Sequence, residues 1–385
     1  MIPYGRQDIN QQDIDAVIDI LKSDYLTQGP QVPLFEKTIN EIVNVDHSIA
    51  VNSATSALHI ACLALGAGKG DIVWTSPITF VASANCALYC GADIDFVDID
   101  PATYNLSTIA LEKKLKQAAE KNKLPKVVIP VHLAGQSCDM LKIHQLSLQY
   151  GFKIIEDASH AIGATYQGDF IGGCKFSDIT VFSFHPVKIV TTAEGGIATT
   201  NCPKLAQNMQ SLRSHGITRD PNLMTEESHG EWYYQQLELG FNYRMSELHA
   251  ALGISQLKRL HEFVGHRATK AAIYDEKLAK LPLTLPYQSD ATQSSWHLYI
   301  IRLQLDKISK THQTVFNALR DAGILVNLHY IPVHLQPYYQ KLGFKAGDFP
   351  VAEEYYKEAI SIPLFAQLSE ADQHHIIQTL EQILL

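Results

Sequence analysis

Apolar residues recur at helical spacing near the start of the chain. In DIDAVIDILK, residues 13–22, the side chains of Ile14, Val17, Ile18 and Leu21 fall on one face. This pattern predicts an amphipathic first helix. The next segment, LTQGPQVPLF, lacks such a pattern and is expected to be irregular.

From about residue 48 to residue 200, short apolar runs alternate with helical patterns. Seven runs have the composition of buried strands: SIAV, DIVW, DIDFVDI, KVVIPV, FKIIED, ITVFSF and GGIATT. A regular alternation of strand and helix predicts an α/β fold, in which helices cover both faces of a mostly parallel sheet.

Helical patterns dominate after residue 203, including a long one near 246–280. WHLYIIRL at 296–303, a helical pattern near 310–322, ILVNLHY and further closing helices predict a smaller α+β domain. The expected division is a large domain over residues 1–255 and a small C-terminal domain over residues 256–385.

Composition narrows the class of protein. The 385 residues are 46% hydrophobic and 18% charged, as in folded globular chains, and the net charge of −9 argues against a nucleic-acid-binding protein. The N-terminus lacks the basic and apolar regions of a secretory signal, so we expect a cytoplasmic protein. The uncharged stretch 72–92 contains Pro77 and Asn85, which favours strand, turn and helix over a membrane span.

The cysteines give no sign of a metal site. None of the six belongs to a CxxC motif. Cys86 and Cys90 are one helical turn apart, but no further Cys or His pair completes a ligand set. We therefore expect reduced cysteines and no bound metal.

Hydroxyl residues follow the first apolar run. NSATS at 52–56 leads into an apolar helix, where free backbone N–H groups, the helix dipole and nearby hydroxyls are suited to a phosphate monoester. The alternative is simple N-capping by Ser53. No GxxxxGK[ST] and no GxGxxG motif follows a strand, so the two common nucleotide-binding loops are not predicted.

Two charged residues follow later apolar runs. Asp157, at the end of KIIED, needs a cation or good donors, and a protonated pyridine nitrogen is one such cation; helix capping is the alternative. Lys188 follows Ser183 in FSFHPVKIVTTAEGG, where a low-dielectric pocket would lower its proton affinity and let it condense with an aldehyde. The alternative is a lysine that reaches solvent. A phosphate anchor, a carboxylate and a lysine in this order are the parts that a pyridoxal phosphate enzyme needs.

Five motifs together resemble one family. NSATSAL, SPITFVAS, EDASHAIGA, FSFHPVKIVTTAEGG and LGFNYRMSE are similar to the successive motifs of the DegT/DnrJ/EryC1/StrS sugar aminotransferases, over nearly the whole chain. The resemblance implies the aminotransferase fold of type I, pyridoxal 5'-phosphate as cofactor, and a homodimer with active sites at the subunit interface.

The resemblance also implies residue roles. Lys188 would bind the cofactor aldehyde and Asp157 its ring nitrogen, and these two are the predicted catalytic residues. Phe80 would stack on the ring and His160 would lie beside its hydroxyl. The residues expected to hold the phosphate are Ser53, Ala54, Thr55, Ser56, Ser183 and, from the other subunit, Asn242.

The ends of the chain are similar to a narrower subgroup. MIPYGRQDINQQDIDAVIDILKSDYLTQGP and LHYIPVHLQPYYQKLGF resemble the members that act in pseudaminic acid biosynthesis. This implies transfer of an amino group from L-glutamate to C4 of a UDP-linked 4-keto-6-deoxy N-acetyl hexose, and an N-terminal arm, residues 1–35, that contacts the substrate pocket. The residues expected to bind substrate are Tyr4, Arg6, Leu26, Thr27, Gln28, Gly29, His329 and Tyr330.

Several alternatives stay open at this point. A surface ion pair would also explain Arg6. The substrate could be a dTDP-linked or 3-keto sugar, and a pyridoxal phosphate fold without turnover is a further alternative. Some family members carry histidine in place of the lysine and dehydrate sugars, which Lys188 argues against. Ala193 stands where a glycine is common, and we expect only a small local adjustment there.

Overall fold

All residues, 1–385, are described by the computed structural model, and the seven predicted runs form one sheet. The strand order is β2-β10-β9-β6-β5-β3-β4, and β10 alone runs antiparallel to its neighbours. The predicted mostly parallel sheet is therefore confirmed. The strands are β2 (His47–Val51), β3 (Ile72–Thr75), β4 (Asp93–Phe96), β5 (Val127–Ile129), β6 (Lys153–Asp157), β9 (Ile179–Ser183) and β10 (Gly196–Thr200).

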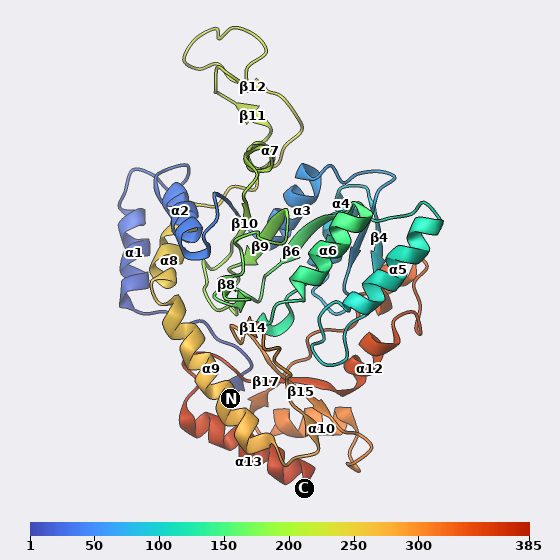
Figure 1. The fold of residues 1–385 in the computed structure, drawn as a ribbon. Helices are drawn as coiled ribbons and strands as arrows, with labels where there is room; N and C mark the ends of the chain where they lie inside the picture. Colours follow the sequence, from blue (N-terminus) through green and yellow to red (C-terminus); the bar gives the residue numbers. More distant parts are fainter.

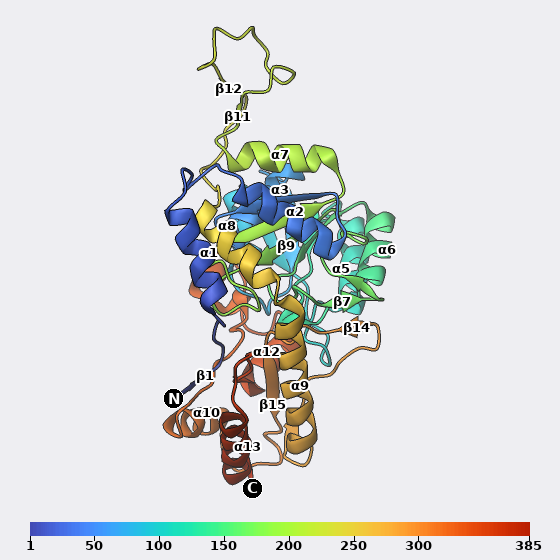
Figure 2. The ribbon, with the colours of Figure 1, turned by 90° about the vertical axis from the view of Figure 1, so that its left-hand side faces the viewer.

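Helices cover both faces of this sheet (Figures 1 and 2). Side chains alternate along β2, so that Ile49 and Val51 join one hydrophobic core and Ala50 joins the other. The first core includes α3 (Ala54–Ala64), α4 (Ala82–Tyr89) and α7 (Pro203–Arg213). The second includes α2 (Gln31–Val43), α5 (Thr108–Glu120), α6 (Met140–Tyr150) and α8 (Glu247–Leu257).

A third core lies in the C-terminal part, at the bottom of Figures 1 and 2. The long helix α9 (Leu260–Leu278) joins it to the large domain, because Phe263 packs in the second core and Tyr274 in the third. The division near residue 255 thus stays a prediction. The main elements here are α9, α10 (His312–Asp321), α12 (Pro350–Glu358), α13 (Glu370–Leu384), and the antiparallel strands β13 (Leu283–Thr284), β15 (Tyr299–Leu303) and β17 (Ala359–Ile362).

The N-terminal segment reaches this C-terminal part before it enters the large domain. Strand β1 (Ile2–Pro3) pairs in parallel with β16 (Ile324–Leu325), and helix α1 (Gln11–Leu21) follows, as predicted. This pairing holds the first residues of the chain against the C-terminal part.

The expectation of an irregular segment at 26–35 is wrong at its end, because α2 already begins at Gln31. The Glu247 carboxylate accepts hydrogen bonds from the N–H groups of Gln31 (2.6 Å) and Val32 (3.4 Å), and so caps the helix from α8. The long helix expected near 246–280 is divided into α8 and α9. The uncharged stretch 72–92 folds as β3 and α4, and no helix combines the length and apolarity that a bilayer crossing needs.

A hairpin arm, residues 214–242, projects from the large domain at the top of Figures 1 and 2. It contains β11 (Ile217–Thr218) and β12 (Gln235–Gln236), and its Trp232 is 75% exposed. The remaining elements are β7 (Thr165–Tyr166), β8 (Asp169–Phe170), β14 (Thr292–Gln293), α11 (Pro337–Gln340) and the short 3-10 helices η1 (Leu133–Gly135) and η2 (Val333–Leu335).

Candidate active site

A cavity of about 550 Å³ lies between the strand ends of the large domain and the C-terminal part. Many predicted site residues, from segments far apart in the sequence, meet in its wall. Those that do are Tyr4, Ser53, Ala54, Thr55, Phe80, Asp157, His160, Ser183, Lys188, His329 and Tyr330. The fold thus brings together both predicted catalytic residues and most of the predicted binding residues.

One end of the cavity is the N-terminus of α3. The Ser53 hydroxyl caps the helix by accepting from the Ser56 N–H (3.2 Å), which is the capping role considered from the sequence. The N–H groups of Ala54 and Thr55 have no acceptor within the helix and border the cavity. Capping and phosphate binding are therefore compatible here. The Ser56 hydroxyl donates to Asn52 (2.7 Å) outside the cavity wall, so its role toward a phosphate stays a prediction.

Asp157 ends β6 and is only 4% exposed. Its Oδ2 accepts from the Ser83 hydroxyl (2.6 Å), and its Oδ1 accepts from the Ser159 N–H (3.1 Å) and hydroxyl (2.6 Å). No cation of the chain pairs with it. The carboxylate is thus held in place by neutral donors and can still receive a cationic group from the cavity.

Ser83 and Ser159 were not predicted. The Asp-x-Ser order of Asp157 and Ser159 is a turn signal that the sequence does contain. Ser83 lies on α4, 74 residues from Asp157, and no local pattern connects the two.

Lys188 lies in the loop between β9 and β10 and makes no ion pair or side-chain hydrogen bond. Burial lowers the pKa of Lys188 to about 8, although the charge of Asp157 acts in the opposite direction. A substantial fraction of this lysine is neutral near pH 8. The amine is therefore available as a nucleophile and as a proton acceptor.

His160 and Tyr330 form a hydrogen-bonded pair beside the lysine. The Nδ1 atom of His160 accepts from the Ala134 N–H (3.2 Å), which places the ring proton on Nε2, 3.0 Å from the Tyr330 hydroxyl. Burial and the charge of Lys188 keep the pKa of His160 well below its usual value, so the ring is neutral. Because Nε2–H donates, the tyrosine hydroxyl can donate its own proton into the cavity.

Two further predicted substrate residues line the cavity, Tyr4 from the N-terminal segment and His329 from the C-terminal part. The rings of Tyr4 and His329 are 5.1 Å apart, and His329 Nδ1 lies 2.8 Å from the Ser361 hydroxyl. Burial and the charge of Lys188 lower the pKa of His329 to about 3, which leaves it neutral at physiological pH. Tyr4 reaches this place because of the pairing of β1 with β16.

Other predicted residues lie outside the cavity wall of this chain. Arg6 is exposed and forms no ion pair, so the surface ion pair considered as its alternative role is not present. Leu26 to Gly29 lie beside the start of α8, where the Leu26 carbonyl accepts from the Glu247 N–H (3.1 Å). Asn242, at the base of the hairpin arm, is exposed. Their roles stay predictions.

The backbone of the lysine loop explains the glycines of TTAEGG. Ala193 has φ +64°, a left-handed conformation that a glycine adopts at lower cost, and this is the local adjustment expected there. A Cβ on Gly196 would meet the backbone of Ala54 at the start of α3. The absence of a side chain at Gly196 therefore lets β10 lie against the N-terminus of α3, where the free N–H groups border the cavity.

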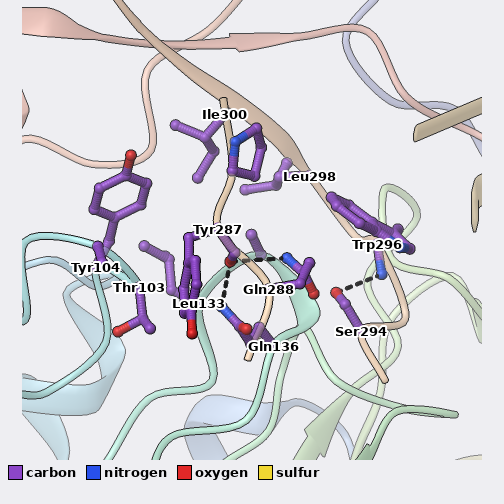
Figure 3. A pocket seen from close by; sticks show the side chains of 13 residues that line it. Thr103, Tyr104, Leu133, Gln136, Tyr287, Gln288, Ser294, Trp296, Leu298 and Ile300 are labelled. Carbon is purple, nitrogen blue, oxygen red and sulfur yellow. Dashed lines mark hydrogen bonds between the residues drawn. The ribbon is translucent and has the colours of Figure 1, made fainter. Parts of the chain in front are cut away.

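A smaller cavity, shown in Figure 3, has different properties. Its volume of about 20 Å³ is sufficient for a single water molecule. The Gln136 side chain donates to the Tyr287 carbonyl (3.0 Å) across its wall, and Leu298 and Ile300 line it. It is a packing gap between residues 102–136 of the large domain and residues 286–300 of the C-terminal part, and it has no room for a substrate.

The polar groups of the large cavity fit a molecule that carries three different functional groups. The free N–H groups of α3 suit a phosphate, Lys188 suits an aldehyde, and Asp157 suits a protonated ring nitrogen. The exposed ring of Phe80 offers a stacking surface between them. Pyridoxal 5'-phosphate carries all of these groups.

Comparison with known proteins agrees with this chemistry. The model of the DegT/DnrJ/EryC1/StrS aminotransferase family matches residues 7–381. The spore coat polysaccharide biosynthesis protein SpsC of Bacillus subtilis is 38% identical over 99% of this chain and 97% of its own. The UDP-4-amino-4,6-dideoxy-N-acetyl-β-L-altrosamine transaminase of Campylobacter jejuni is also 38% identical, over 100% of this chain and 98% of its own.

Solved structures show the same fold. PseC of Helicobacter pylori, an aminotransferase involved in the biosynthesis of pseudoaminic acid, has a TM-score of 0.90 and 31% identity, over 100% of this chain and 99% of that one. The PLP form of the putative sugar aminotransferase Spr1654 from Streptococcus pneumoniae has a TM-score of 0.88 and 29% identity, over the full length of both chains.

Proposed function

Because the chain belongs to the DegT/DnrJ/EryC1/StrS aminotransferase family and uses pyridoxal 5'-phosphate, we propose a specific sugar transamination. The amino group of L-glutamate is transferred to C4 of UDP-2-acetamido-2,6-dideoxy-β-L-arabino-4-hexulose. The products are 2-oxoglutarate and UDP-4-amino-4,6-dideoxy-N-acetyl-β-L-altrosamine, an intermediate of pseudaminic acid biosynthesis. The observation that carries the transamination is that an unpaired Lys188 amine and an Asp157 carboxylate held by neutral donors line the same cavity.

When bound, the cofactor supplies an electron sink for the carbon from which a proton is removed. Lys188 performs the proton transfer: its Nζ, with a pKa of about 8, takes the proton from the α carbon of glutamate and later returns one to C4 of the sugar. Asp157 would hold the protonated ring nitrogen. The hydroxyls of Ser83 and Ser159 keep its carboxylate in position.

The neutral groups around the lysine orient the substrate. Tyr330, which receives a hydrogen bond from His160, donates to an oxygen in the cavity. Tyr4 and His329 offer aromatic surface and hydrogen-bonding groups to the sugar. Because His160 and His329 both stay neutral, they add no positive charge that would further lower the proton affinity of Lys188.

We also propose that a homodimer completes the site. Arg6, Leu26 to Gly29 and Asn242 lie outside the cavity of their own chain, and the exposed hairpin arm extends well beyond the large domain (Figure 1). A second copy would place Asn242 against the phosphate and the remaining residues near the nucleotide. Light scattering of the purified protein should give twice the mass of one chain, and a monomer with full activity would contradict this proposal.

The decisive experiment is product identification. The purified holoenzyme, supplied with glutamate and the UDP-linked 4-keto sugar, should form the amino sugar named above, as identified by mass spectrometry and NMR. The Bacillus relative matches at the same identity as the transaminase from Campylobacter, so a panel of keto sugars belongs in the same experiment. Activity only on a dTDP-linked or 3-keto sugar would contradict the proposed substrate while leaving the transamination in place.

Lys188→Ala tests the transamination itself. We expect no detectable amino sugar and no covalently bound cofactor, with an unchanged circular dichroism spectrum. Lys175→Ala is the matched control, because Lys175 lies on the surface of the same domain in an ion pair with Asp169. Retained turnover in Lys188→Ala, or equal loss in both variants, would refute the role of Lys188.

A further inference from the structure

A second large opening lies beside the catalytic cavity and takes no part in the steps above. This groove has a volume of about 520 Å³ and lies between α4 and α11. Its lining residues are Val81, Asn85, Leu88, Tyr89, Gln336, Pro337, Tyr338 and Tyr339. None of them is charged.

The groove and the catalytic cavity adjoin one turn of the chain. Val81 lines the groove, whereas its neighbours Phe80 and Ala82 line the cavity, so a single turn before α4 separates the two. The ring of Phe80 lies 6.3 Å from that of Tyr330, which also lines the catalytic cavity. A ligand with its reacting end near Lys188 would reach the groove by passing over this turn.

The groove wall offers two aromatic rings. Tyr89 is 55% exposed and Tyr338 is 59% exposed, and both line this open groove. Tyr89 belongs to α4 and Tyr338 to α11, the two helices that form the groove. Exposed tyrosine rings in a concave site are suited to a flat heteroaromatic ligand.

The hydrogen-bonding groups in the groove are side-chain amides. Tyr339, which is 2% exposed, donates its hydroxyl proton to Asn85 Oδ1 (2.6 Å). This bond fixes the orientation of the amide, so that Nδ2 of Asn85 is the group left to donate to a ligand. Gln336 has no side-chain hydrogen bond within the chain and can offer both a donor and an acceptor.

We propose that this groove binds the nucleobase of the nucleotide sugar, and that the base is a pyrimidine-2,4-dione, the ring system shared by uracil and thymine. The ring packs between Tyr89 and Tyr338, a ring carbonyl accepts from Asn85 Nδ2, and Gln336 pairs with the ring N–H and the second carbonyl. This proposal rests on the proposed function, since it assigns a place to the nucleotide of the same substrate. It also provides a basis for selection against cytosine, whose exocyclic amino group is a donor where the dione has an acceptor.

The test measures nucleotide binding to the holoenzyme by isothermal titration calorimetry, with UDP, dTDP, CDP and inorganic pyrophosphate as probes. Tyr338→Ala and Tyr89→Ala should each raise the Kd of UDP about tenfold, because stacking on one aromatic ring contributes about that factor. The Kd of pyrophosphate, which has no base, should stay unchanged. Tyr287→Ala is the matched control, since this tyrosine is 53% exposed and lies at the small cavity of Figure 3.

A conservative variant tests the hydrogen-bond assignment. Asn85→Asp keeps an acceptor for Tyr339 but removes the donor, so the preference for UDP over CDP should fall about tenfold or more. The relative Kd values of UDP and dTDP then show which of the two diones the groove accepts. Unchanged UDP affinity in both tyrosine variants, or an unchanged UDP to CDP ratio in Asn85→Asp, would overturn the proposal.

The outcomes for the two proposals are distinguishable. If the enzyme aminates the UDP-linked sugar with an unchanged KM in Tyr338→Ala, the groove assignment fails and the proposed function stands. If no UDP-linked sugar reacts but UDP binding weakens as described, the groove assignment stands and the proposed function fails. A groove that is closed by a second subunit, seen as tyrosine variants that dissociate the dimer without changing the Kd of UDP, would also overturn the groove assignment.

Discussion

Glu156 and Asp157 are adjacent at the end of β6, and each is only 4% exposed, yet they serve opposite faces of the sheet. The Glu156 carboxylate accepts from His132 Nε2 (2.8 Å) and from the hydroxyls of Ser177 (2.5 Å) and Thr180 (3.1 Å). The Asp157 carboxylate faces the catalytic cavity. The comparison shows that burial alone does not distinguish a structural carboxylate from a functional one.

The two carboxylates differ in whether their hydrogen-bond partners leave one side free for a ligand. His132 Nδ1 accepts from the Cys138 N–H (3.1 Å), so its single ring proton is on Nε2 and is donated to Glu156. Burial raises the pKa of Glu156, but the three hydrogen bonds outweigh this effect and hold it below its usual value. Both carboxylates are held by donors of the chain itself, but only Asp157 lines the cavity and so keeps one side open to a ligand.

The largest expected effect is that of Asp157→Asn on turnover. An asparagine keeps an acceptor for Ser159 and can donate to the Ser83 hydroxyl, so unfolding of the apo protein should change by less than about 1 kcal/mol. The loss of the negative charge beside the ring nitrogen should lower kcat by about 10²–10³-fold. Steady-state kinetics and urea unfolding measure the two effects. Full activity in this variant would refute the role of Asp157.

Glu156→Gln should produce the opposite result. The glutamine Oε1 can still face the Nε2–H of His132, and its NH₂ then meets the Ser177 and Thr180 hydroxyls. The buried site thus exchanges a charged acceptor for a neutral amide, at a cost of about 1–2 kcal/mol in unfolding free energy. Turnover per folded molecule should stay within about twofold. The stabilisation by Glu156 is present above its unfolded pKa of about 4.3 and is lost as the pH falls through its lower folded value, so the difference between wild type and variant should shrink below about pH 4. A variant that keeps its stability but loses activity would reverse our assignment of the two carboxylates.

Much of the fold and part of this comparison could be predicted from the sequence. The seven apolar runs became the seven strands of the sheet, and Asp157, Lys188 and the N-terminus of α3 meet in one cavity as the motif order indicated. The start of α2 at Gln31 could not be predicted, because its cap is Glu247, 216 residues away. The same applies to Ser83, which holds Asp157 across 74 residues. Long-range hydrogen bonds leave no local pattern in the sequence.

The third prediction concerns the ionisation of Lys188 in the apo enzyme. Acylation of this lysine, followed by peptide mass spectrometry, should titrate with a pKa of about 8, compared with about 10.4 for an unperturbed lysine. Because the carboxylate of Asp157 raises this pKa, Asp157→Asn should lower it further. Glu156→Gln should leave it unchanged, since Glu156 lies on the other face. An equal shift in both variants would show that the two faces are electrostatically coupled, contrary to our interpretation.

The smallest expected effect concerns backbone strain, which we compare between the two faces of the sheet. Each face has a residue other than glycine in the left-handed region: Ala193 (φ +64°) in the lysine loop and Cys174 (φ +52°) near Glu156. The Cys174 thiol contacts Thr180 and Thr199 hydroxyls (both 3.4 Å) and donates to the Thr199 carbonyl (3.2 Å), so its side chain offsets the strain. The methyl group of Ala193 is exposed and makes no such contacts.

Ala193→Gly should therefore stabilise the protein slightly, and Cys174→Gly should destabilise it. Relief of about 1–2 kcal/mol of left-handed strain at Ala193, reduced by about 0.5–1 kcal/mol of glycine entropy, gives a net gain of about 0.5 kcal/mol. At Cys174 the same relief is outweighed by the loss of a half-buried side chain and its hydrogen bonds, for a net loss of about 1–2 kcal/mol. Urea unfolding at neutral pH resolves the two signs. Equal signs would mean that the cavity face is no more strained than the structural one, and that Ala193 has contacts in solution that offset its conformation.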